Sequence, residues 1–381
     1  MLLRLRTTET SSELEPLYQL AEELGYRPEP LDDARRVLEL VRPDGSPGAP
    51  ADRSRIEDLT CVQAVLDASD APELTQLDAD RPRTVVRIRD AVIGDGRPAF
   101  LAGPCAVEDQ TDLFEIARSV HASGALVLRG GAFKPRTSPY SFQGLGREGL
   151  ERLRAVRDET GLGIVTEVLD PRDVDAVAEV ADAIQLGSRS MSNATLLREV
   201  GTSGVPVLLK RGLAATVREF LLAAEYLLDA GNANVVLCER GVRGFDSVTR
   251  NVLDVGAVAY LKRTTHLPVL VDPSHAAGRA DLVAPLALSG LAAGADGVIV
   301  EVHPRPARVH SDGAQAISLD TFADIVRRGT ALAAITSDEG DFLPPPASLE
   351  RNGTPVAGRN ARHGDSRFEP SGPARAEEHA S

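Results

Sequence analysis

Short apolar runs recur at regular intervals between about residues 95 and 335, and longer segments with helical spacing separate them. The runs number eight: "AFLAG", "ALVLRG", "GIVTEV", "AIQLG", "PVLLKR", "NVVLCERG", "PVLVDPS" and "GVIVEV". Continuous apolar strands that alternate with amphipathic helices are typical of parallel β/α units. Eight units predict an α/β fold with a (β/α)₈ TIM barrel over residues 86–336. A doubly wound open sheet is the alternative, but it gives no reason for eight repeats.

Residues 1–85 follow a different pattern. "MLLRLRT" and "ARRVLELVRP" alternate like strands, whereas "SELEPLYQLAEELGY" and "RIEDLTCVQAVLDAS" have helical spacing. "RTVVRIRDAVI" is a further strand with a connector, and "PDGSPGAPADRS" is a loose loop. This order predicts a small α+β module of ferredoxin-like type.

The final segment, residues 337–381, is rich in Pro, Gly, Ser and charged residues and poor in aliphatic ones. Such a composition cannot bury enough apolar surface to offset its ordering entropy, so we predict a disordered tail.

Bulk composition excludes several classes of protein. The net charge of -14 argues against a nucleic-acid binder, and no apolar run approaches the length of a membrane span. The N-terminus becomes polar too early for a signal peptide. Three widely spaced cysteines, Cys61, Cys105 and Cys238, suggest reduced thiols in a cytoplasmic protein.

The catalytic residues of a TIM barrel follow the C-terminal ends of its strands. In this sequence those positions are unusually basic, although the chain is acidic: Arg129, Lys134, Arg136, Arg189, Lys210 and Arg240. Arginine presents a planar fork to phosphate or carboxylate, and lysine presents a point charge. The convergence of these residues predicts ligands with several negative charges, although any one residue alone could be a solvated surface charge. Lys210 has a second interpretation as a Schiff-base nucleophile.

A second set of strand-end residues has the mixed chemistry of metal ligands: Cys105, His275, Glu301 and Asp312. A thiolate, an imidazole and carboxylates suit a divalent ion such as Mn, Fe, Co or Zn. No spacing motif links them, so Cys105 could equally be a buried apolar residue and His275 a helix cap. His303 is a further candidate for an acid/base or supporting role.

These segments resemble one enzyme family. "AGPCAVE", "LRGGAFKPRTSPYSFQGLG", "VLLKRG", "LCERG", "RNVLD", "LVDPSH" and "VEVHP" followed by "SDG" are similar to the type I-beta branch of 3-deoxy-D-arabino-heptulosonate 7-phosphate (DAHP) synthases. The resemblance spans about residues 95 to 335. "KPRTS" is its most specific part, because 3-deoxy-D-manno-octulosonate 8-phosphate (KDO8P) synthases typically carry a Lys-Ala-Asn segment there.

The resemblance implies a transferase that condenses phosphoenolpyruvate (PEP) with erythrose 4-phosphate and releases phosphate, the first step of the shikimate pathway. It implies that Cys105, His275, Glu301 and Asp312 bind the metal, with Mn²⁺ the first choice. It assigns PEP binding to Arg129, Lys134, Arg189, Lys210 and Arg240. It places erythrose 4-phosphate at Arg136 and Thr137, with Ser138, Asp272 and Arg279 nearby. The alternative is a KDO8P synthase or an enzyme that uses another aldose phosphate.

Lys134 is the residue that we expect to transfer a proton, alongside Cys105 and His275 as catalytic residues. Two neighbouring arginines should lower the pKa of Lys134. The family's N-terminal domain also binds an aromatic amino-acid effector in regulated members. The His and Ser expected for that contact are not evident around "GYRPEPLDDA", so a packing module without effector is the alternative. Family members assemble as dimers or tetramers, and we expect a homo-oligomer.

Overall fold

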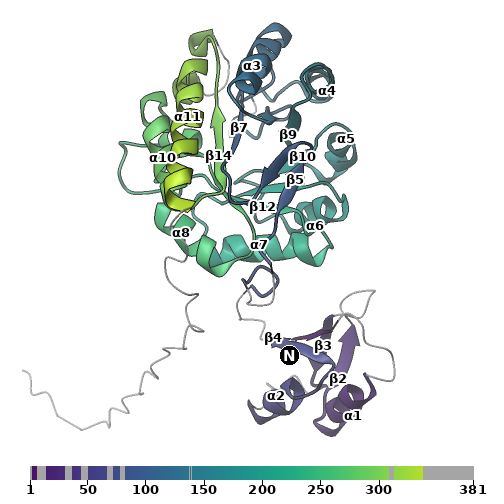
Figure 1. Cartoon of the computed structure of the whole chain (residues 1–381). Helices are drawn as coiled ribbons and strands as arrows, with labels where there is room; N and C mark the ends of the chain where they lie inside the picture. Colours follow the sequence, from purple (N-terminus) through teal and green to yellow (C-terminus); the bar gives the residue numbers. More distant parts are fainter. Residues whose placement is uncertain are drawn as a thin grey trace, which may run out of the picture. The chain divides into compact units, whose positions relative to one another are not determined.

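The computed structural model describes residues 2–6, 14–30, 37–43, 50–66, 72–77, 82–136, 138, 140–308 and 313–337. Eight parallel strands close into a barrel in the order β10-β11-β12-β13-β14-β7-β8-β9, and helices surround it (Figure 1). The predicted TIM barrel is therefore confirmed, because an open doubly wound sheet would leave two edges. Of the predicted disordered tail, Ser337 is the last residue of a helix, and residues 338–381 lie outside the described residues.

Each of the eight apolar runs forms one barrel strand. The strands are β7 (Ala99–Gly103), β8 (Val127–Arg129), β9 (Gly163–Glu167), β10 (Ala183–Leu186), β11 (Val207–Lys210), β12 (Val235–Glu239), β13 (Val269–Val271) and β14 (Gly297–Glu301). All residues of β9, β12 and β14 are buried. Such strands lose apolar alternation because helices cover one face and the barrel interior covers the other.

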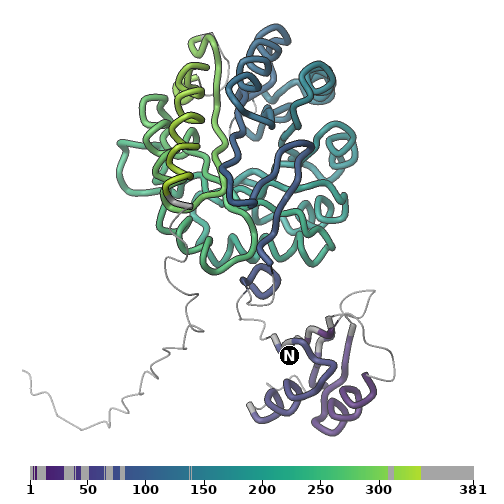
Figure 2. Tube along the Cα trace, in the orientation of Figure 1, coloured from purple at the N-terminus to yellow at the C-terminus, as the bar shows by residue number. Residues whose placement is uncertain are grey.

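Helices connect successive strands and form the outer layer. They are α3 (Gln110–Ala122), α4 (Arg147–Thr160), α5 (Val174–Ala178), α6 (Ala194–Thr202), α7 (Val217–Asp229), α8 (Val255–Thr264), α9 (Pro273–Ala277), α10 (Val283–Ala292) and α11 (Leu319–Ser337). The chain trace in Figure 2 shows the yellow-green α11 returning beside the blue segment that begins the barrel. The first and last β/α units thus become neighbours, which closes the ring.

A short hairpin fills one end of the barrel interior. Its strands, β5 (Val86–Ile88) and β6 (Ala91–Ile93), are antiparallel. Their four buried apolar side chains join one cluster with inward-facing residues of all eight barrel strands, such as Leu101, Val165 and Ile299. This end of the barrel is therefore a packed core, and any chemistry belongs to the opposite end.

The N-terminal module has the order β1 (Leu2–Leu5), α1 (Glu15–Glu23), β2 (Arg27–Pro30), β3 (Val37–Val41), α2 (Pro50–Glu57) and β4 (Val62–Leu66). Its sheet has the order β2-β3-β1-β4, and all neighbours are antiparallel. This βαββαβ arrangement is ferredoxin-like, as the sequence predicted.

Two local predictions in this module are wrong. "RIEDLTCVQAVLDAS" is not one helix, because α2 ends at Glu57 and the strand β4 begins at Val62. The burial of Val62 and Val65 against β1 outweighs the helical spacing of their apolar neighbours. The loose loop predicted up to residue 54 also contains the first turn of α2. The strand β2, which contains two prolines, was not predicted.

Candidate active site

The strand ends opposite the hairpin surround a cavity of about 490 Å³. Residues at or after the ends of β8, β9, β10, β11 and β12 line it, together with His275 from α9. These segments are far apart in sequence and meet only because parallel strands point their C-terminal ends the same way. Of the residues predicted to form the site, those that line the cavity are Arg129, Lys134, Arg136, Ser138, Arg189, Lys210, Arg240 and His275.

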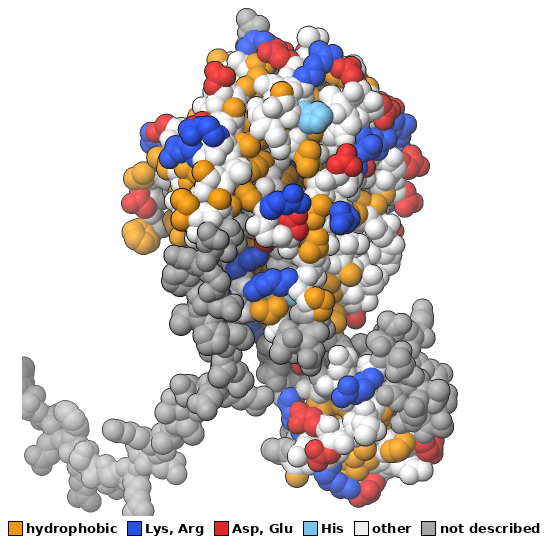
Figure 3. All heavy atoms as spheres, in the orientation of Figure 1, with side chains coloured by type: hydrophobic (Ala, Val, Ile, Leu, Met, Phe, Trp, Pro, Cys, Tyr) orange, Lys and Arg blue, Asp and Glu red, His pale blue; other side chains and the backbone are white. Residues whose placement is uncertain are grey.

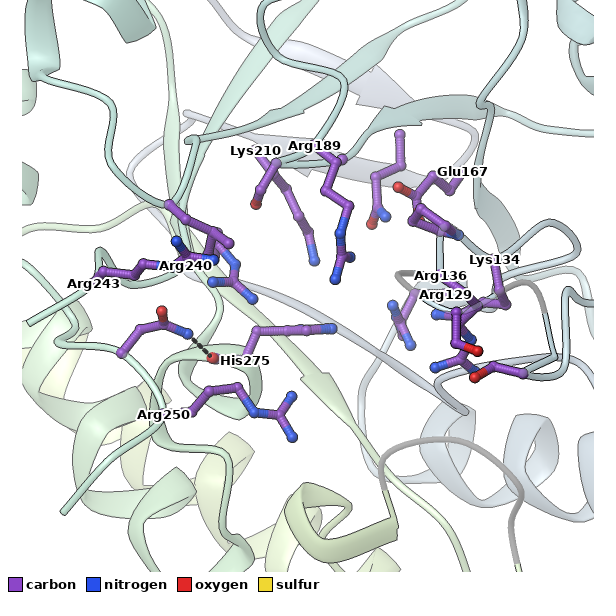
Figure 4. A pocket seen from close by; sticks show the side chains of 18 residues that line it. Arg129, Lys134, Arg136, Glu167, Arg189, Lys210, Arg240, Arg243, Arg250 and His275 are labelled. Carbon is purple, nitrogen blue, oxygen red and sulfur yellow. Dashed lines mark hydrogen bonds between the residues drawn. The ribbon is translucent and has the colours of Figure 1, made fainter. Parts of the chain in front are cut away.

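The cavity is strongly cationic. Eight arginines and lysines line it, whereas Glu167 is its one carboxylate among the residues that the structure describes. In Figure 4, Arg129, Lys134 and Arg136 lie on one side and Arg240 and Arg243 on the other. On the outer face in Figure 3, by contrast, acidic and basic side chains are interspersed. The positive charge is thus local to the cavity of an acidic chain.

Arg240 is a buried cation of this cavity without a carboxylate partner among the described residues. It is only 7% exposed, and within the described part of the chain its guanidinium donates one hydrogen bond, a long contact of 3.4 Å to the carbonyl of Gly241. No described carboxylate pairs with it. Burial lowers the pKa of its guanidinium. Burying an unpaired cation is costly, so an anionic ligand here would relieve a cost that folding has already incurred.

Asp272 links Lys210 to His275 inside the barrel. Its carboxylate forms an ion pair with Lys210 and accepts a hydrogen bond from His275 Nδ1 at 2.7 Å. Burial opposes charge on Asp272, but His275 and Lys210 together hold its pKa well below the usual range. Burial lowers the pKa of His275, which keeps the imidazole neutral at neutral pH and frees Nε2 to bind a ligand.

Glu301 and Cys105 form a neighbouring buried group. Glu301 accepts hydrogen bonds from Arg129 at 3.1 Å and Gln315 at 2.6 Å, and its Oε1 lies 3.3 Å from His275 Nε2. Lys134 donates to the Cys105 carbonyl at 3.0 Å and to its thiol at 3.1 Å. Three of the four predicted metal ligands therefore belong to one network of polar contacts, in which Arg129, Lys134 and His275 line the cavity.

The expected lowering of the Lys134 pKa is wrong. Burial favours the neutral amine and Arg129 repels the ammonium, but Cys105, Glu167 and Glu301 outweigh both and raise the pKa. The sequence shows the basic neighbours of Lys134 along the chain, whereas its acidic neighbours come from other strands. Lys134 is therefore a persistent ammonium group that donates hydrogen bonds.

The donor chemistry of this cluster fits a divalent ion. It offers a thiol, a neutral imidazole and a carboxylate, which are typical ligands of Mn, Fe, Co or Zn. Within the described residues, no three of these donors are arranged as a complete metal-holding group. The fourth predicted ligand, Asp312, lies outside the described residues, as does Thr137.

A buried ion-pair network supports the ends of β11 and β12, and the sequence did not indicate it. Arg211 Nη1 lies 2.8 Å from Glu239 and 3.1 Å from Asp254. Glu239 is fully buried, and its other oxygen accepts the Gly241 amide at 2.7 Å. Arg211 and Glu239 flank Lys210 and Arg240 along the chain, so the network fixes the backbone from which those two cations project.

Other predicted residues lie elsewhere. Arg279 pairs with Asp281 at the surface and does not line the cavity. Asp272 contacts cavity residues from behind rather than lining the cavity itself. Cys61 and Cys238 are buried and form no disulfide within the described residues, consistent with packing roles. Cavity residues that the sequence did not single out include Gln185, Arg243, Arg250 and Asn251. Two of them, Arg250 and Asn251, belong to "RNVLD", which the sequence indicated only as part of the family resemblance.

Fold and cavity together define a (β/α)₈-barrel protein with a strongly cationic cavity at the C-terminal ends of its strands. The chain belongs to the DAHP synthetase I family, whose sequence profile matches residues 75–334. None of the helices in the described part of the chain combines the length and apolar character needed to cross a bilayer.

Individual relatives differ in how similar their sequences are to this chain. A phospho-2-dehydro-3-deoxyheptonate aldolase of Thermotoga maritima is 47% identical over 279 residues, which cover 73% of this chain and 82% of the relative. A 2-dehydro-3-deoxyphosphooctonate aldolase of Syntrophotalea carbinolica is 32% identical over 270 residues, which cover 66% of this chain and 96% of the relative.

Two solved structures of proteins from Thermotoga maritima are also similar to this chain. The superposition on a DAHP synthase crystal structure covers 88% of this chain and 97% of the DAHP synthase chain, with a TM-score of 0.69 and 41% identity. The superposition on a truncated form of 3-deoxy-D-arabino-heptulosonate 7-phosphate synthase covers 69% of this chain and 97% of the truncated chain, with a TM-score of 0.64 and 44% identity.

Proposed function

We propose that this protein is a DAHP synthase, which condenses PEP with erythrose 4-phosphate to give DAHP and inorganic phosphate. The observation that carries the proposal is a cationic cavity at the barrel's strand ends in which Arg240 is buried without a carboxylate partner among the described residues. Both substrates are anionic and repel each other in water. A cationic cavity offsets that repulsion and orients the reacting carbons.

The positions of the cations suggest how PEP binds. Arg189, Lys210 and Arg240 project into the cavity near one another and suit the phosphate. Arg129 and Lys134 lie across the cavity and suit the carboxylate. Because the pKa of Lys134 is raised, this residue would act as a fixed cation and proton donor rather than as a base. Arg136, with Thr137 and Ser138, would bind the phosphate of the aldose.

The reaction needs little covalent participation by the protein. The methylene carbon of PEP attacks the aldehyde carbon, and water adds to the PEP carbon that carries oxygen. The resulting phosphohemiketal loses inorganic phosphate by C–O cleavage. We propose that Cys105, His275, Glu301 and Asp312 hold a divalent metal ion, with Mn²⁺ as first choice. When bound, such an ion polarises a carbonyl as a Lewis acid. Asp272 would keep the His275 ring oriented toward it.

PEP consumption with erythrose 4-phosphate, before and after chelation and with Mn²⁺ added back, tests this proposal. Loss of activity on chelation and recovery with Mn²⁺ would support both the reaction and the ligand set. Turnover with arabinose 5-phosphate but not with erythrose 4-phosphate would assign the KDO8P synthase reaction instead. Activity that survives complete metal removal would overturn the ligand set, and borohydride trapping of Lys210 would then test the Schiff-base alternative.

The remaining assignments concern regulation and assembly. We propose that residues 1–85 form a separate domain that an aromatic amino acid can bind, and that the chain forms a homo-oligomer. The ferredoxin-like topology of the described part supports a separate module. Calorimetric titration with tyrosine or phenylalanine would test the effector, and multi-angle light scattering would test the assembly. Absence of binding to both amino acids would favour the packing module.

A further inference from the structure

The loop between β12 and α8 carries two arginines, Arg243 and Arg250, to which the proposed reaction assigns no role. Both line the same cavity as Arg240. Arg240 is buried, whereas Arg243 and Arg250 are exposed. The three arginines therefore extend from the cavity interior to its solvent-facing rim on the side opposite Arg136 (Figure 4).

Backbone hydrogen bonds hold this loop in place. Val242 and Val252 pair across it with two bonds of 3.0 and 2.8 Å. The Arg243 amide donates to the Leu213 carbonyl at 2.7 Å, and the Arg250 amide donates to a carbonyl of α9 at 3.0 Å. Both arginines thus start from fixed backbone, so less conformational entropy would be lost when an anion binds.

Two glycines allow the loop to pack this closely. Gly278 has a φ of 68°, and a Cβ on it would lie 2.6 Å from the Arg250 Cβ and 3.0 Å from its Nε. Gly241 has a φ of 92°, and its Cβ would lie 2.8 Å from the Asn251 Cβ. Any side chain at either position would displace the segment that presents Arg250 to the cavity.

Three arginines, Arg240, Arg243 and Arg250, line this corner of the cavity. No described carboxylate pairs with Arg243 or Arg240. Burial lowers the pKa of Arg240, and repulsion from Arg250 adds to that effect, which places the two guanidinium groups within electrostatic reach of each other. An anion between the inner and outer arginines would reduce this repulsion.

We propose that Arg243 and Arg250 form an outer subsite, next to Arg240, that binds a phosphate dianion at the rim of the cavity. Arginine suits this ligand because its planar fork donates two parallel hydrogen bonds to phosphate oxygens. The inference rests on the proposed function, in which phosphate groups enter with both substrates and inorganic phosphate leaves. The ligand is therefore either the phosphate of an arriving substrate or the released product.

Calorimetry can isolate the outer subsite without turnover. The full chain is first saturated with PEP, which fills the inner site, and inorganic phosphate is then titrated in. We expect the double variant Arg243→Gln, Arg250→Gln to weaken phosphate binding roughly tenfold. The control Arg97→Gln removes an arginine that is 81% exposed, precedes β7 and pairs with Asp95, and it should change nothing.

A further variant separates this subsite from the one on the opposite side. If Arg136→Gln abolishes phosphate binding to the PEP-loaded protein while the double variant retains it, the proposal is overturned. It is also overturned if the PEP-loaded wild type binds no phosphate. A matched Arg243→Lys, Arg250→Lys variant should show intermediate affinity, and thermal unfolding would confirm that all variants fold.

Steady-state kinetics distinguish the source of the phosphate. An increased inhibition constant for inorganic phosphate with unchanged KM values would identify the released product. An increased KM for PEP or for erythrose 4-phosphate would identify an arriving substrate, and no change in any of these constants would refute the subsite. If PEP fails to bind in the first titration, the proposed function fails, but phosphate titration of the PEP-free protein still tests the subsite.

Discussion

The buried carboxylate of Glu239 gives a sharp test of how the barrel fixes its cations. One oxygen of Glu239 accepts from Arg211 at 2.8 Å and the other accepts from the Gly241 amide at 2.7 Å. In Glu239→Gln the side chain keeps its shape but offers one oxygen and one NH₂ group. Whichever way the amide turns, one buried donor faces another donor.

The expected cost follows from these contacts. A hydrogen bond to a charged group contributes about 1.5–3 kcal/mol, and an unsatisfied buried donor adds a desolvation penalty. Arg211 keeps its contacts with Asp254 and with the Ala215 carbonyl. The decrease in the free energy of unfolding should therefore stay below the roughly 3–5 kcal/mol expected when one partner of a buried ion pair is removed and the other is left alone. We expect Glu239→Gln to destabilise the fold by about 2 kcal/mol, or roughly 4–8 °C in Tm.

Urea and thermal unfolding of both proteins would measure this cost, with Glu159→Gln as the matched control. Glu159 pairs with Arg118 on the surface, and the two side chains are 44% and 64% exposed, so its substitution should cost less than about 0.5 kcal/mol. Equal stability of the two variants would refute the reasoning. Because Gly241 follows Arg240, Glu239→Gln should also raise the KM for PEP, whereas Glu159→Gln should leave it unchanged.

Three further substitutions, two of them with a matched comparison variant, test other parts of the barrel. Asp272→Asn removes the carboxylate shared by Lys210 and His275, so kcat/KM in the PEP assay should fall tenfold or more. An unchanged kcat/KM would show that neither side chain needs this carboxylate to be positioned for the reaction. Arg240→Met removes an unpaired buried cation, so Tm should not fall while calorimetry shows PEP affinity weakened roughly tenfold. Arg211→Met should instead lower Tm, and a loss in both variants would contradict this contrast. Gly103→Ala places a Cβ 1.9 Å from the Arg129 carbonyl oxygen and should lower the free energy of unfolding in urea by more than about 2 kcal/mol. Gly256→Ala in α8 should instead stabilise the fold slightly. Equal stability of these two alanine variants would count against the close strand approach.

Much of the site could be predicted because the functional residues of a TIM barrel lie at the C-terminal ends of its strands. Arg129, Lys210 and Glu301 each end an apolar run, and the structure places all three at strand C-termini. The proton affinity of Lys134 could not be predicted in the same way. Along the chain its charged neighbours are arginines, but in space Cys105 and two glutamates surround it.

The sequence by itself determined the number of β/α units, the face on which the cations gather and the resemblance to a family, because these depend on local periodicity and on residue order. Tertiary structure decided which charges are compensated: it pairs Lys210 with Asp272 and Arg211 with Glu239, and it leaves Arg240 buried without a described carboxylate partner. It also turned Arg279 to the surface and brought Arg243 and Arg250 to the cavity. The physical reason is that electrostatic energies depend on distance and burial between groups far apart in the chain.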